Sequence, residues 1–325
     1  MSIDFTIAIP TYNGASRLPK LFERLRSQTG IDNIFWEVII VDNNSSDNTA
    51  EIVQHHQAQW PSDIPLKYCF EGKQGAAFAR QHAAREASGE FIGFLDDDNL
   101  PASDWIAASY SFAQKHPKGG AFSGRILGDF EVAPPEGFEK IKAYMAIRDH
   151  GPTPHLFDPD NIRLPPAAAL LIRKQAWVES IPTSPILPGR LGKVMVGGED
   201  YELSLHLHKK GWEIWYNPSM VSYHQIPGWR LKREYLLSLA RACGLATCPL
   251  RMINANSWQK PSIFVRTLIG NLRRVVVQYI KHKEKMETDL ISAFEMEFFL
   301  GSLISPFYFL KVYIRQWQNS IQPDN

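Results

Sequence analysis

The stretch Phe91-Ile-Gly-Phe-Leu-Asp-Asp-Asp98 joins a short uncharged run to three consecutive carboxylates. A run of this length, bounded by polar residues, is typical of a strand that is buried on both faces of a parallel sheet. Two similar runs, residues 5–9 and 36–41, come earlier in the chain, and each is followed by turn or polar residues. Helix-like segments separate the three runs, so this part of the chain indicates successive βαβ units of an α/β fold.

The rest of the chain changes character twice. After a predicted helix at residues 103–116, a proline-rich stretch at 134–188 surrounds an apolar strand at 167–172. From about Arg230 the sequence reads as helical to its end. We therefore expect a Rossmann-like, mainly parallel mixed sheet flanked by helices in a domain of residues 1–230, followed by a helical C-terminal extension of residues 231–325.

Composition narrows the classes of partner and compartment. The 35 basic and 34 acidic residues give a net charge of +1, so no nucleic-acid partner is expected. The three cysteines, Cys69, Cys243 and Cys248, form neither a disulfide framework nor a four-thiolate zinc site, which favours a reducing compartment. No secretory signal is recognisable, and the uncharged segment at 298–310 is shorter than the roughly 20 residues that span a bilayer. We expect a cytoplasmic protein.

Polar side chains follow all three predicted strands, at the sheet edge where ligands bind in open α/β folds. The first strand is followed by Pro10, Thr11, Tyr12 and Asn13, the second by Asp42, and the third by Asp96, Asp97 and Asp98. Carboxylates gathered at one edge repel one another unless a cation compensates them. A divalent metal, Mn²⁺ or Mg²⁺, that also binds substrate phosphates is the economical explanation. The alternative is an exposed turn or helix cap, where Asp and Asn are common.

These residues lie in segments that resemble family 2 glycosyltransferases, which have the GT-A fold. The matching segments are Ile7-Ala-Ile-Pro-Thr-Tyr-Asn-Gly14, Val38-Ile-Ile-Val-Asp-Asn-Asn-Ser-Ser-Asp-Asn-Thr49, Gly75-Ala-Ala-Phe-Ala-Arg-Gln81 and Gly89-Glu-Phe-Ile-Gly-Phe-Leu-Asp-Asp-Asp98. A later segment, Gly198-Glu-Asp-Tyr-Glu-Leu203, extends the match to about Tyr223. The overall pattern also resembles the cyanobacterial hormogonium polysaccharide glycosyltransferases.

The resemblance implies a donor site for a nucleotide sugar. Its nucleotide pocket is lined by Pro10, Thr11, Tyr12 and Asn13, with Asp42 reading the base and Arg80 near the diphosphate. Gln81 replaces the asparagine that usually follows this arginine, which leaves that neighbour's contribution open. The Asp-x-Asp pattern places Asp96 close to the nucleoside sugar and Asp97 in the same site.

The resemblance also implies the metal ligands and the base. Asp98 is the principal protein ligand of the metal, and His224 completes its shell, although a lone histidine is often an ordinary packed residue. Asp200, beside Glu199, is the general base of family members that invert the anomeric centre. The alternative is that both carboxylates cap the following helix, where the helix dipole favours them.

The C-terminal region combines basic and aromatic segments. Basic residues between 266 and 285 alternate with apolar ones, as in a helix lying on an anionic membrane, while a solvated helix packed on the first domain is the alternative. Residues 294–317 are rich in aromatic side chains, which suits peripheral membrane contact or a homodimer equally well.

The predicted function is that of an inverting, metal-dependent, hexosyltransferase-like enzyme. It transfers a sugar from a nucleoside-diphosphate sugar to a hydroxyl of a saccharide or lipid-linked acceptor, in polysaccharide or glycolipid synthesis at the inner face of the plasma membrane. A sugar nucleotidyltransferase is one alternative, but residues 10–14 contain a single glycine and no Lys or Arg. A catalytically inactive nucleotide-sugar-binding protein is the other, and retention of Asp98 and Asp200 argues against it.

Overall fold

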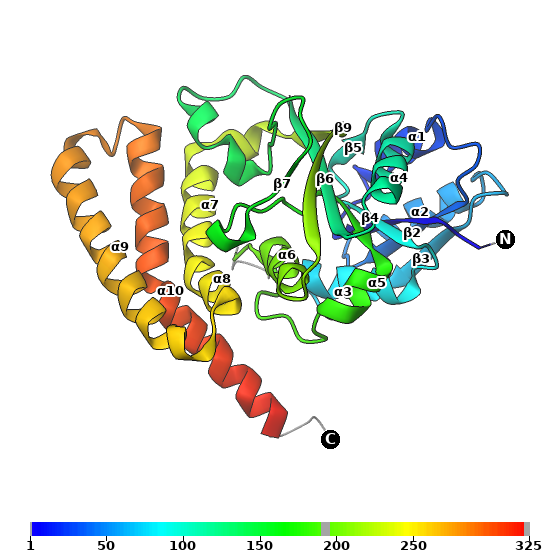
Figure 1. Cartoon of the computed structure of the whole chain (residues 1–325). Helices are drawn as coiled ribbons and strands as arrows, with labels where there is room; N and C mark the ends of the chain where they lie inside the picture. The colour runs from blue at the N-terminus through cyan, green and yellow to red at the C-terminus, as the bar shows by residue number, and fades with distance from the viewer. Residues whose placement is uncertain (1, 190–195, 322–325) are drawn as a thin grey trace.

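The computed structural model describes residues 2–189 and 196–321, and for residues 313 and 315–321 it describes the backbone alone. In this part of the chain, nine strands form one mixed sheet (Figure 1). The strands lie in the order β3 (Leu66–Phe70), β2 (Trp36–Asp42), β1 (Phe5–Thr11), β4 (Phe91–Leu95), β8 (Ala169–Arg173), β6 (Gly119–Phe130), β9 (Glu213–Ile226) and β5 (Asn99–Pro101), and β7 (His155–Leu156) pairs with β9.

The predicted α/β architecture is confirmed. The three strands expected from apolar runs are β1, β2 and β4, and β1 pairs in parallel with both of the others. Their register places Thr11 opposite Asp42 at the carboxyl edge. Beyond β4 the sheet is mixed, because β8 runs antiparallel to both β4 and β6.

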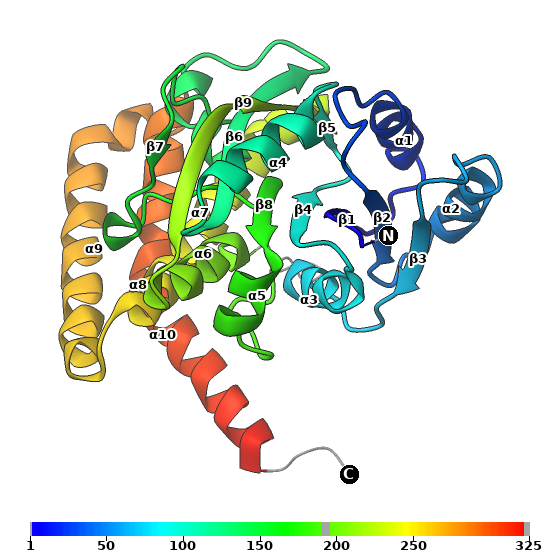
Figure 2. The ribbon, with the colours of Figure 1, turned by 45° about the vertical axis from the view of Figure 1, so that its right-hand side comes forward.

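Helices cover both faces of the sheet (Figure 2). One buried cluster joins alternate sheet residues, such as Ile7 of β1, to α1 (Leu18–Arg26), α2 (Thr49–Gln57) and α4 (Trp105–Lys115). Ala8, the neighbouring residue of β1, belongs to the cluster on the opposite face, with α3 (Ala76–Glu86), α5 (Lys174–Ser180) and α6 (Glu199–Lys209). Short 3-10 turns make up the irregular stretches: η1 (Phe138–Lys140), η2 (Lys142–Met145) and η3 (Pro159–Asn161).

The C-terminal region is helical, as predicted. It comprises η4 (Gly228–Leu231), α7 (Arg233–Leu245), α8 (Thr247–Asn254), η5 (Ser257–Gln259), α9 (Lys260–His282), η6 (Lys283–Lys285) and α10 (Leu290–Ile321). A third apolar cluster crosses residue 230, since it joins Phe138 and Ile226 to Leu236 of α7 and Phe294 of α10. The helices therefore pack on the sheet-bearing part, and the boundary at residue 230 stays a prediction.

Two helical stretches, Arg233–Asn254 and Leu290–Val312, are long and apolar enough to cross a membrane. The uncharged segment at 298–310 is thus part of a longer apolar helix than its sequence alone indicated. Core helices of soluble proteins share this length and composition, and 61% of the first stretch is buried against 44% of the second. Length alone therefore does not assign either helix to a membrane.

Candidate active site

A cavity of about 1080 Å³ opens at the carboxyl ends of β1 and β4. Most of the predicted site residues line it, namely Pro10, Thr11, Tyr12, Arg80, Asp96, Asp97, Asp98, Glu199, Asp200 and His224. Asn13 and Asp42 are not among the described residues that line it. The structure therefore gathers ten of the twelve predicted residues around one space.

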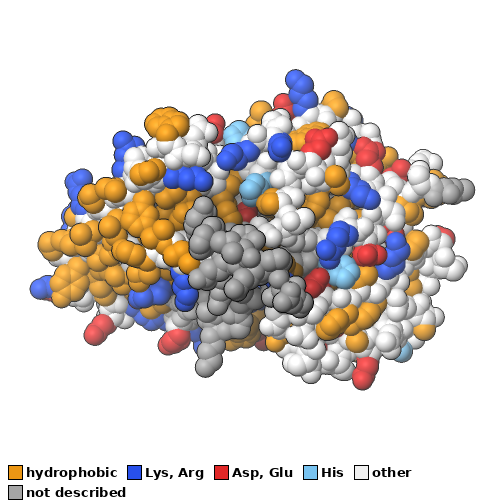
Figure 3. Space-filling model, turned by 90° about the horizontal axis from the view of Figure 1, so that it is seen from below, with side chains coloured by type: hydrophobic (Ala, Val, Ile, Leu, Met, Phe, Trp, Pro, Cys, Tyr) orange, Lys and Arg blue, Asp and Glu red, His pale blue; other side chains and the backbone are white. Residues whose placement is uncertain are grey.

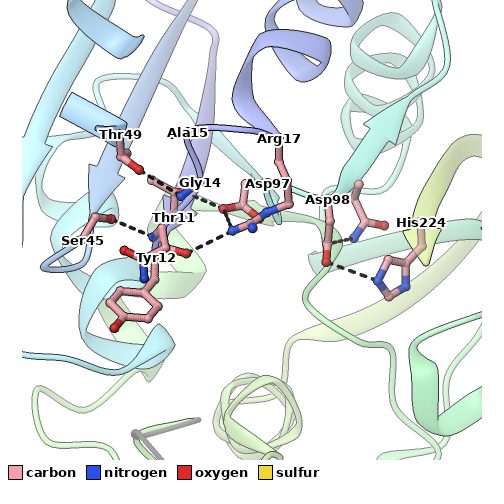
Figure 4. Close-up of polar contacts among 12 residues, drawn as sticks. Thr11, Tyr12, Gly14, Ala15, Arg17, Ser45, Thr49, Asp97, Asp98 and His224 are labelled. Carbon is pink, nitrogen blue, oxygen red and sulfur yellow. Dashed lines mark hydrogen bonds and ion pairs between the residues drawn. The ribbon is translucent and has the colours of Figure 1, made fainter. Parts of the chain in front are cut away.

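Asp97 holds the loop after β1 against the aspartate turn (Figure 4). Arg17 donates hydrogen bonds to both carboxylate oxygens of Asp97, with Nε 2.7 Å from Oδ1 and Nη2 2.8 Å from Oδ2. The Thr11 hydroxyl also donates to Oδ2, at 2.5 Å. Arg17 Nη2 also donates to the Tyr12 carbonyl at 3.0 Å. Such bidentate charged pairs fix geometry as well as charge. Asp97 thus fixes the loop after β1, and the half-exposed ring of Tyr12 faces the cavity.

Asp42 and Asn13 make contacts behind this loop. The Tyr68 hydroxyl donates to Asp42 Oδ2 at 2.8 Å, and the Ser45 amide donates to Oδ1 at 2.9 Å. Burial and this bond raise the pKa of Tyr68 to about 12. Asn13, at a φ of 50°, accepts from the Ser46 amide at 2.8 Å. Asn13 thus ties the loop after β1 to the loop after β2, and Asp42 ties the loop after β2 to β3. Their roles toward a nucleotide stay predictions.

Asp98 and His224 face each other because of strand pairing. β5 begins directly after Asp98 and pairs with β9, which places Asn99 opposite His224. His224 Nδ1 lies 2.9 Å from the Met145 carbonyl, which can only accept, so this nitrogen carries the proton. The lone pair of Nε2 then points toward Asp98 Oδ2, 3.5 Å away (Figure 4). The unprotonated Nε2 of His224 and the carboxylate of Asp98 thus face each other in a buried position.

The guanidinium of Arg230, in η4, lies between His224 and Asp98. Its Nη1 lies 2.8 Å from Asp98 Oδ2 and 3.2 Å from His224 Nε2. Burial raises the pKa of Asp98, but the charge and hydrogen bond of Arg230 oppose it, and the pKa lies below its usual value. No cluster of three or more His, Cys, Asp or Glu side chains suited to a metal occurs among the described residues. The pair nonetheless fits a Mg²⁺ or Mn²⁺ site, because such ions bind through few protein ligands plus substrate phosphates.

Arg80 connects the aspartate turn to the start of α6. Its side chain is buried, with Nη2 3.0 Å from Asp96 Oδ1 and Nη1 3.5 Å from Glu199 Oε1. Within the described part of the molecule, Arg80 Nε and Glu199 Oε2 are buried without a hydrogen-bond partner. Unpaired buried polar atoms are costly, so this link leaves bonding capacity for a bound molecule.

Asp200 stands at the first turn of α6. Gly198 begins the helix at a φ of +103°, a conformation that glycine adopts readily. Asp200 Oδ1 accepts from the Tyr201 amide at 2.9 Å, and Oδ2 accepts weakly from the Ala167 amide at 3.4 Å. Burial and the charge of Glu199 raise the pKa of Asp200 to about 6, although Arg80 opposes them. The carboxylate is therefore ionised at neutral pH and more basic than an exposed one.

The far half of the cavity was not predicted from the sequence. It is lined by side chains of η2, α7, α8 and α10, including Tyr144, Leu239, Leu250 and Phe298. These residues come from segments without a recognisable motif, and only the tertiary packing brings them beside Asp200. The helical C-terminal region thus forms part of the site.

Comparison with known proteins gives the family. The model of the glycosyl transferase family 2 matches residues 6–174, just over half of the 325 residues. The succinoglycan biosynthesis protein ExoM of Rhizobium meliloti is 24% identical over 246 residues, 72% of both chains. A Campylobacter jejuni β-1,3-glucosyltransferase, named for GalNAc(5)-diNAcBac-PP-undecaprenol, is 35% identical over 96 residues, 29% of both chains.

Other relatives match over a short span or at low identity. The glycosyltransferase AglE of Haloferax volcanii is 32% identical over 107 residues, and the chain covers 34% of its length. Among solved structures, a Pyrobaculum calidifontis mannosyltransferase in complex with GDP-Man and Mn²⁺ superposes with a TM-score of 0.59 at 19% identity, over 95% of this chain and 88% of that one. Staphylococcus aureus TarS 1-349 with UDP gives 0.51 at 15% identity, over 95% and 92%.

The structural likenesses, all below 25% identity, establish the GT-A fold that the resemblance implied. The family match establishes more, because it covers the strands and turns that carry Thr11, Asp42, Arg80 and Asp96 to Asp98. The chain belongs to glycosyltransferase family 2.

Proposed function

We propose that this chain is an inverting glycosyltransferase that uses a nucleoside-diphosphate sugar as donor and Asp200 as general base. The observation that carries the proposal is the shared cavity: Asp200 faces the same space as Asp96 and the Asp98–His224 pair. A displacement at a sugar carbon requires a base for the attacking hydroxyl and a site that holds the departing phosphate, both facing the same cavity.

The proposed step balances around the anomeric carbon. The acceptor hydroxyl gives its proton to Asp200 as its oxygen bonds to C1 of the sugar. The bond between C1 and the phosphate oxygen breaks, and the nucleoside diphosphate leaves with that electron pair. A pKa of about 6 suits Asp200 to this role, because a base is most effective when its pKa lies near the working pH.

The donor site is proposed on the loops after β1 and β4. Tyr12 offers a half-exposed ring toward the base, and the Arg17–Asp97 pair holds its loop in place. Arg80 reaches the same edge from α3 and bonds Asp96, so it can orient the sugar or diphosphate end of the donor. Asp42 and Asn13 would contribute by fixing the loops from behind.

We propose Asp98 and His224 as the ligands of a divalent cation, Mn²⁺ or Mg²⁺. When bound, this ion would neutralise charge on the departing diphosphate. Arg230 occupies the space between the two ligands, so it has to move away before they can bind an ion. A place for Arg230 beside the phosphates is compatible with its position on η4, directly after β9.

The acceptor is proposed to be a saccharide or lipid-linked saccharide in polysaccharide or glycolipid synthesis. The names of ExoM and of the Campylobacter enzyme describe such pathways for those relatives. Support in this chain comes from the far half of the cavity, which apolar and aromatic side chains of α7, α8 and α10 line next to Asp200. We propose work in the cytoplasm at the inner membrane face, with peripheral membrane contact or homodimerisation through the C-terminal helices.

The test is a donor screen with product analysis. The full chain is incubated with UDP-, GDP- and dTDP-sugars, with and without Mn²⁺, and release of nucleoside diphosphate and the anomeric configuration of the product are measured by NMR. We expect one donor class to react with inversion. Pyrophosphate release from a nucleoside triphosphate and a sugar 1-phosphate would instead identify a nucleotidyltransferase. Tight donor binding without transfer or hydrolysis would identify an inactive binding protein.

A further inference from the structure

Helix α9 presents its apolar side chains to the outside. Val265, Ile269, Leu272, Val276 and Ile280 follow one another at intervals of three or four residues, so they share one face of the helix. All five are exposed, Ile269 by 62% and Ile280 by 70%. A surface helix in water normally turns such a stripe toward the protein core.

The opposite face of α9 is buried and polar. Thr267, Asn271 and Gln278 are its buried residues. Gln278 donates to the Ser292 carbonyl at 3.1 Å and to Glu295 at 3.2 Å, both on α10, and Thr267 accepts from Arg251 of α8 at 3.4 Å. These bonds fix the rotation of the helix. The apolar stripe therefore cannot turn inward without breaking them.

The exposed apolar surface continues onto α10. Figure 3 shows apolar side chains gathered on the side of the molecule where α9 and α10 lie, with basic side chains around them. Ile304, Phe307, Leu310 and Ile314 of α10 are 40–55% exposed. At the start of α9, Trp258 is 77% exposed, and tryptophan favours the boundary between apolar and aqueous phases. A continuous patch of this kind marks an interaction surface.

The charge of this surface selects the partner. Residues 256–283 contain Lys260, Arg266, Arg273, Arg274, Lys281 and Lys283 and no Asp or Glu. A second copy of the chain on the same face would bring the cations that flank the stripe, such as Arg266 and Arg273, together across a two-fold axis, which is unfavourable. Anionic lipid headgroups above an acyl boundary match both the charges and the apolar stripe. We propose that the α9–α10 face docks on an anionic membrane surface, with the apolar stripe of α9 in the interface.

The experiment is vesicle flotation with the full chain. Vesicles of phosphatidylcholine alone are compared with vesicles that also contain phosphatidylglycerol, at low and high salt. We expect flotation with the anionic vesicles, weakened by salt. The double variant Ile269→Glu/Ile280→Glu should lose at least about tenfold in vesicle binding, because it places charge in the apolar stripe. Val178→Glu, at an equally exposed apolar residue of α5, is the matched control and should float like the wild type.

A charge variant separates the two contributions. The variant Arg266→Gln/Arg273→Gln/Lys281→Gln should bind the anionic vesicles at least about tenfold more weakly, since each basic side chain near such a surface raises the binding constant roughly fivefold. No flotation of the wild type, or unchanged flotation of the Ile269→Glu/Ile280→Glu variant, would overturn the proposal. A wild-type dimer that this variant converts to monomer would also overturn it and assign the face to a second copy. Circular dichroism spectra and thermal melting of the variants show that they are folded. The result does not depend on whether the proposed transfer is correct.

Discussion

The two halves of the cavity hold their carboxylates in different ways. On the donor side, Asp97 is paired with Arg17 and Asp98 with Arg230. On the acceptor side, the hydrogen bonds to Asp200 within the described part of the chain come from two backbone amides, one of them at 3.4 Å, and Glu199 Oε2 is buried without a partner among the same residues. Against the effect of burial, Arg230 keeps the pKa of Asp98 below its usual value, whereas burial raises the pKa of Asp200 and also that of Asp97. The difference supports the proposal that Asp98 contributes to donor binding and that Asp200 takes up a proton.

The largest expected effect breaks the donor half. Asp98→Ala should reduce transfer to the background level, because it removes the carboxylate proposed to hold the cation at the diphosphate. Binding of the nucleoside diphosphate, measured by calorimetry, should lose its enhancement by Mn²⁺. Transfer that persists at the wild-type rate in EDTA would show that no metal takes part.

The next effect breaks the acceptor half alone. Asp200→Asn should lower the turnover number at least about a hundredfold, since it removes the proton acceptor needed in the transition state. Donor affinity should stay within about twofold of the wild type, because the hydrogen bonds of Asp200 within the described residues are to the Tyr201 and Ala167 amides and not to the loops after β1 and β4. Asp129→Asn, an exposed carboxylate outside the cavity, is the control. Equal losses of affinity and turnover would place Asp200 in the donor pocket or the helix cap.

A smaller effect tests the competition at Asp98. Arg230→Gln should bind Mn²⁺ about tenfold more tightly than the wild type, because one charge-assisted hydrogen bond no longer has to be broken. The measurement is the Mn²⁺ EPR signal in titrations without donor, which does not depend on activity. Lys232→Gln, at the exposed neighbour of the same turn, should behave like the wild type. Weaker Mn²⁺ binding by Arg230→Gln would contradict the shared position.

The smallest effect sharpens the assignment of the base. Turnover should fall as the pH drops through about 6, because burial and the charge of Glu199 raise the pKa of Asp200 to that value and the protonated form cannot act as a base. Glu199→Gln removes the neighbouring negative charge, so the acid limb of the pH profile should move to lower pH. A limb that stays in place, or that moves to higher pH, would assign the titration to another group.

The sequence predicted the strands that consist of long apolar runs and missed most of the others, including the short buried strand β5. Strands β1, β2 and β4 follow from apolar runs, whereas β3 is only half-buried and contains Lys67. The long β6 is interrupted by Gly119, Gly120, Gly124 and Gly128, which weaken any strand pattern. Strand β9 owes its length to pairing with β5, β6 and β7, which are distant in sequence.

For the site, sequence motifs located the residues but not their partners. Asp96 and Asp98 lie at a strand end, where the fold prediction placed a site, whereas Arg80 and Asp200 were assigned by the resemblance to the family. The partner of Asp97, Arg17, is 80 residues away, and Arg230 is 132 residues from Asp98. Such pairs depend on the tertiary structure and leave no periodic signal in the sequence.

The position of Arg230 has a consequence for the stability of the chain when no ligand is bound. Because its guanidinium already compensates Asp98 and His224, the unliganded fold carries its own counter-ion at the proposed metal site. Chelation would then leave the melting temperature nearly unchanged, in contrast to folds that a metal holds together. Loss of the proposed cation would therefore leave the chain folded and able to bind the ion again.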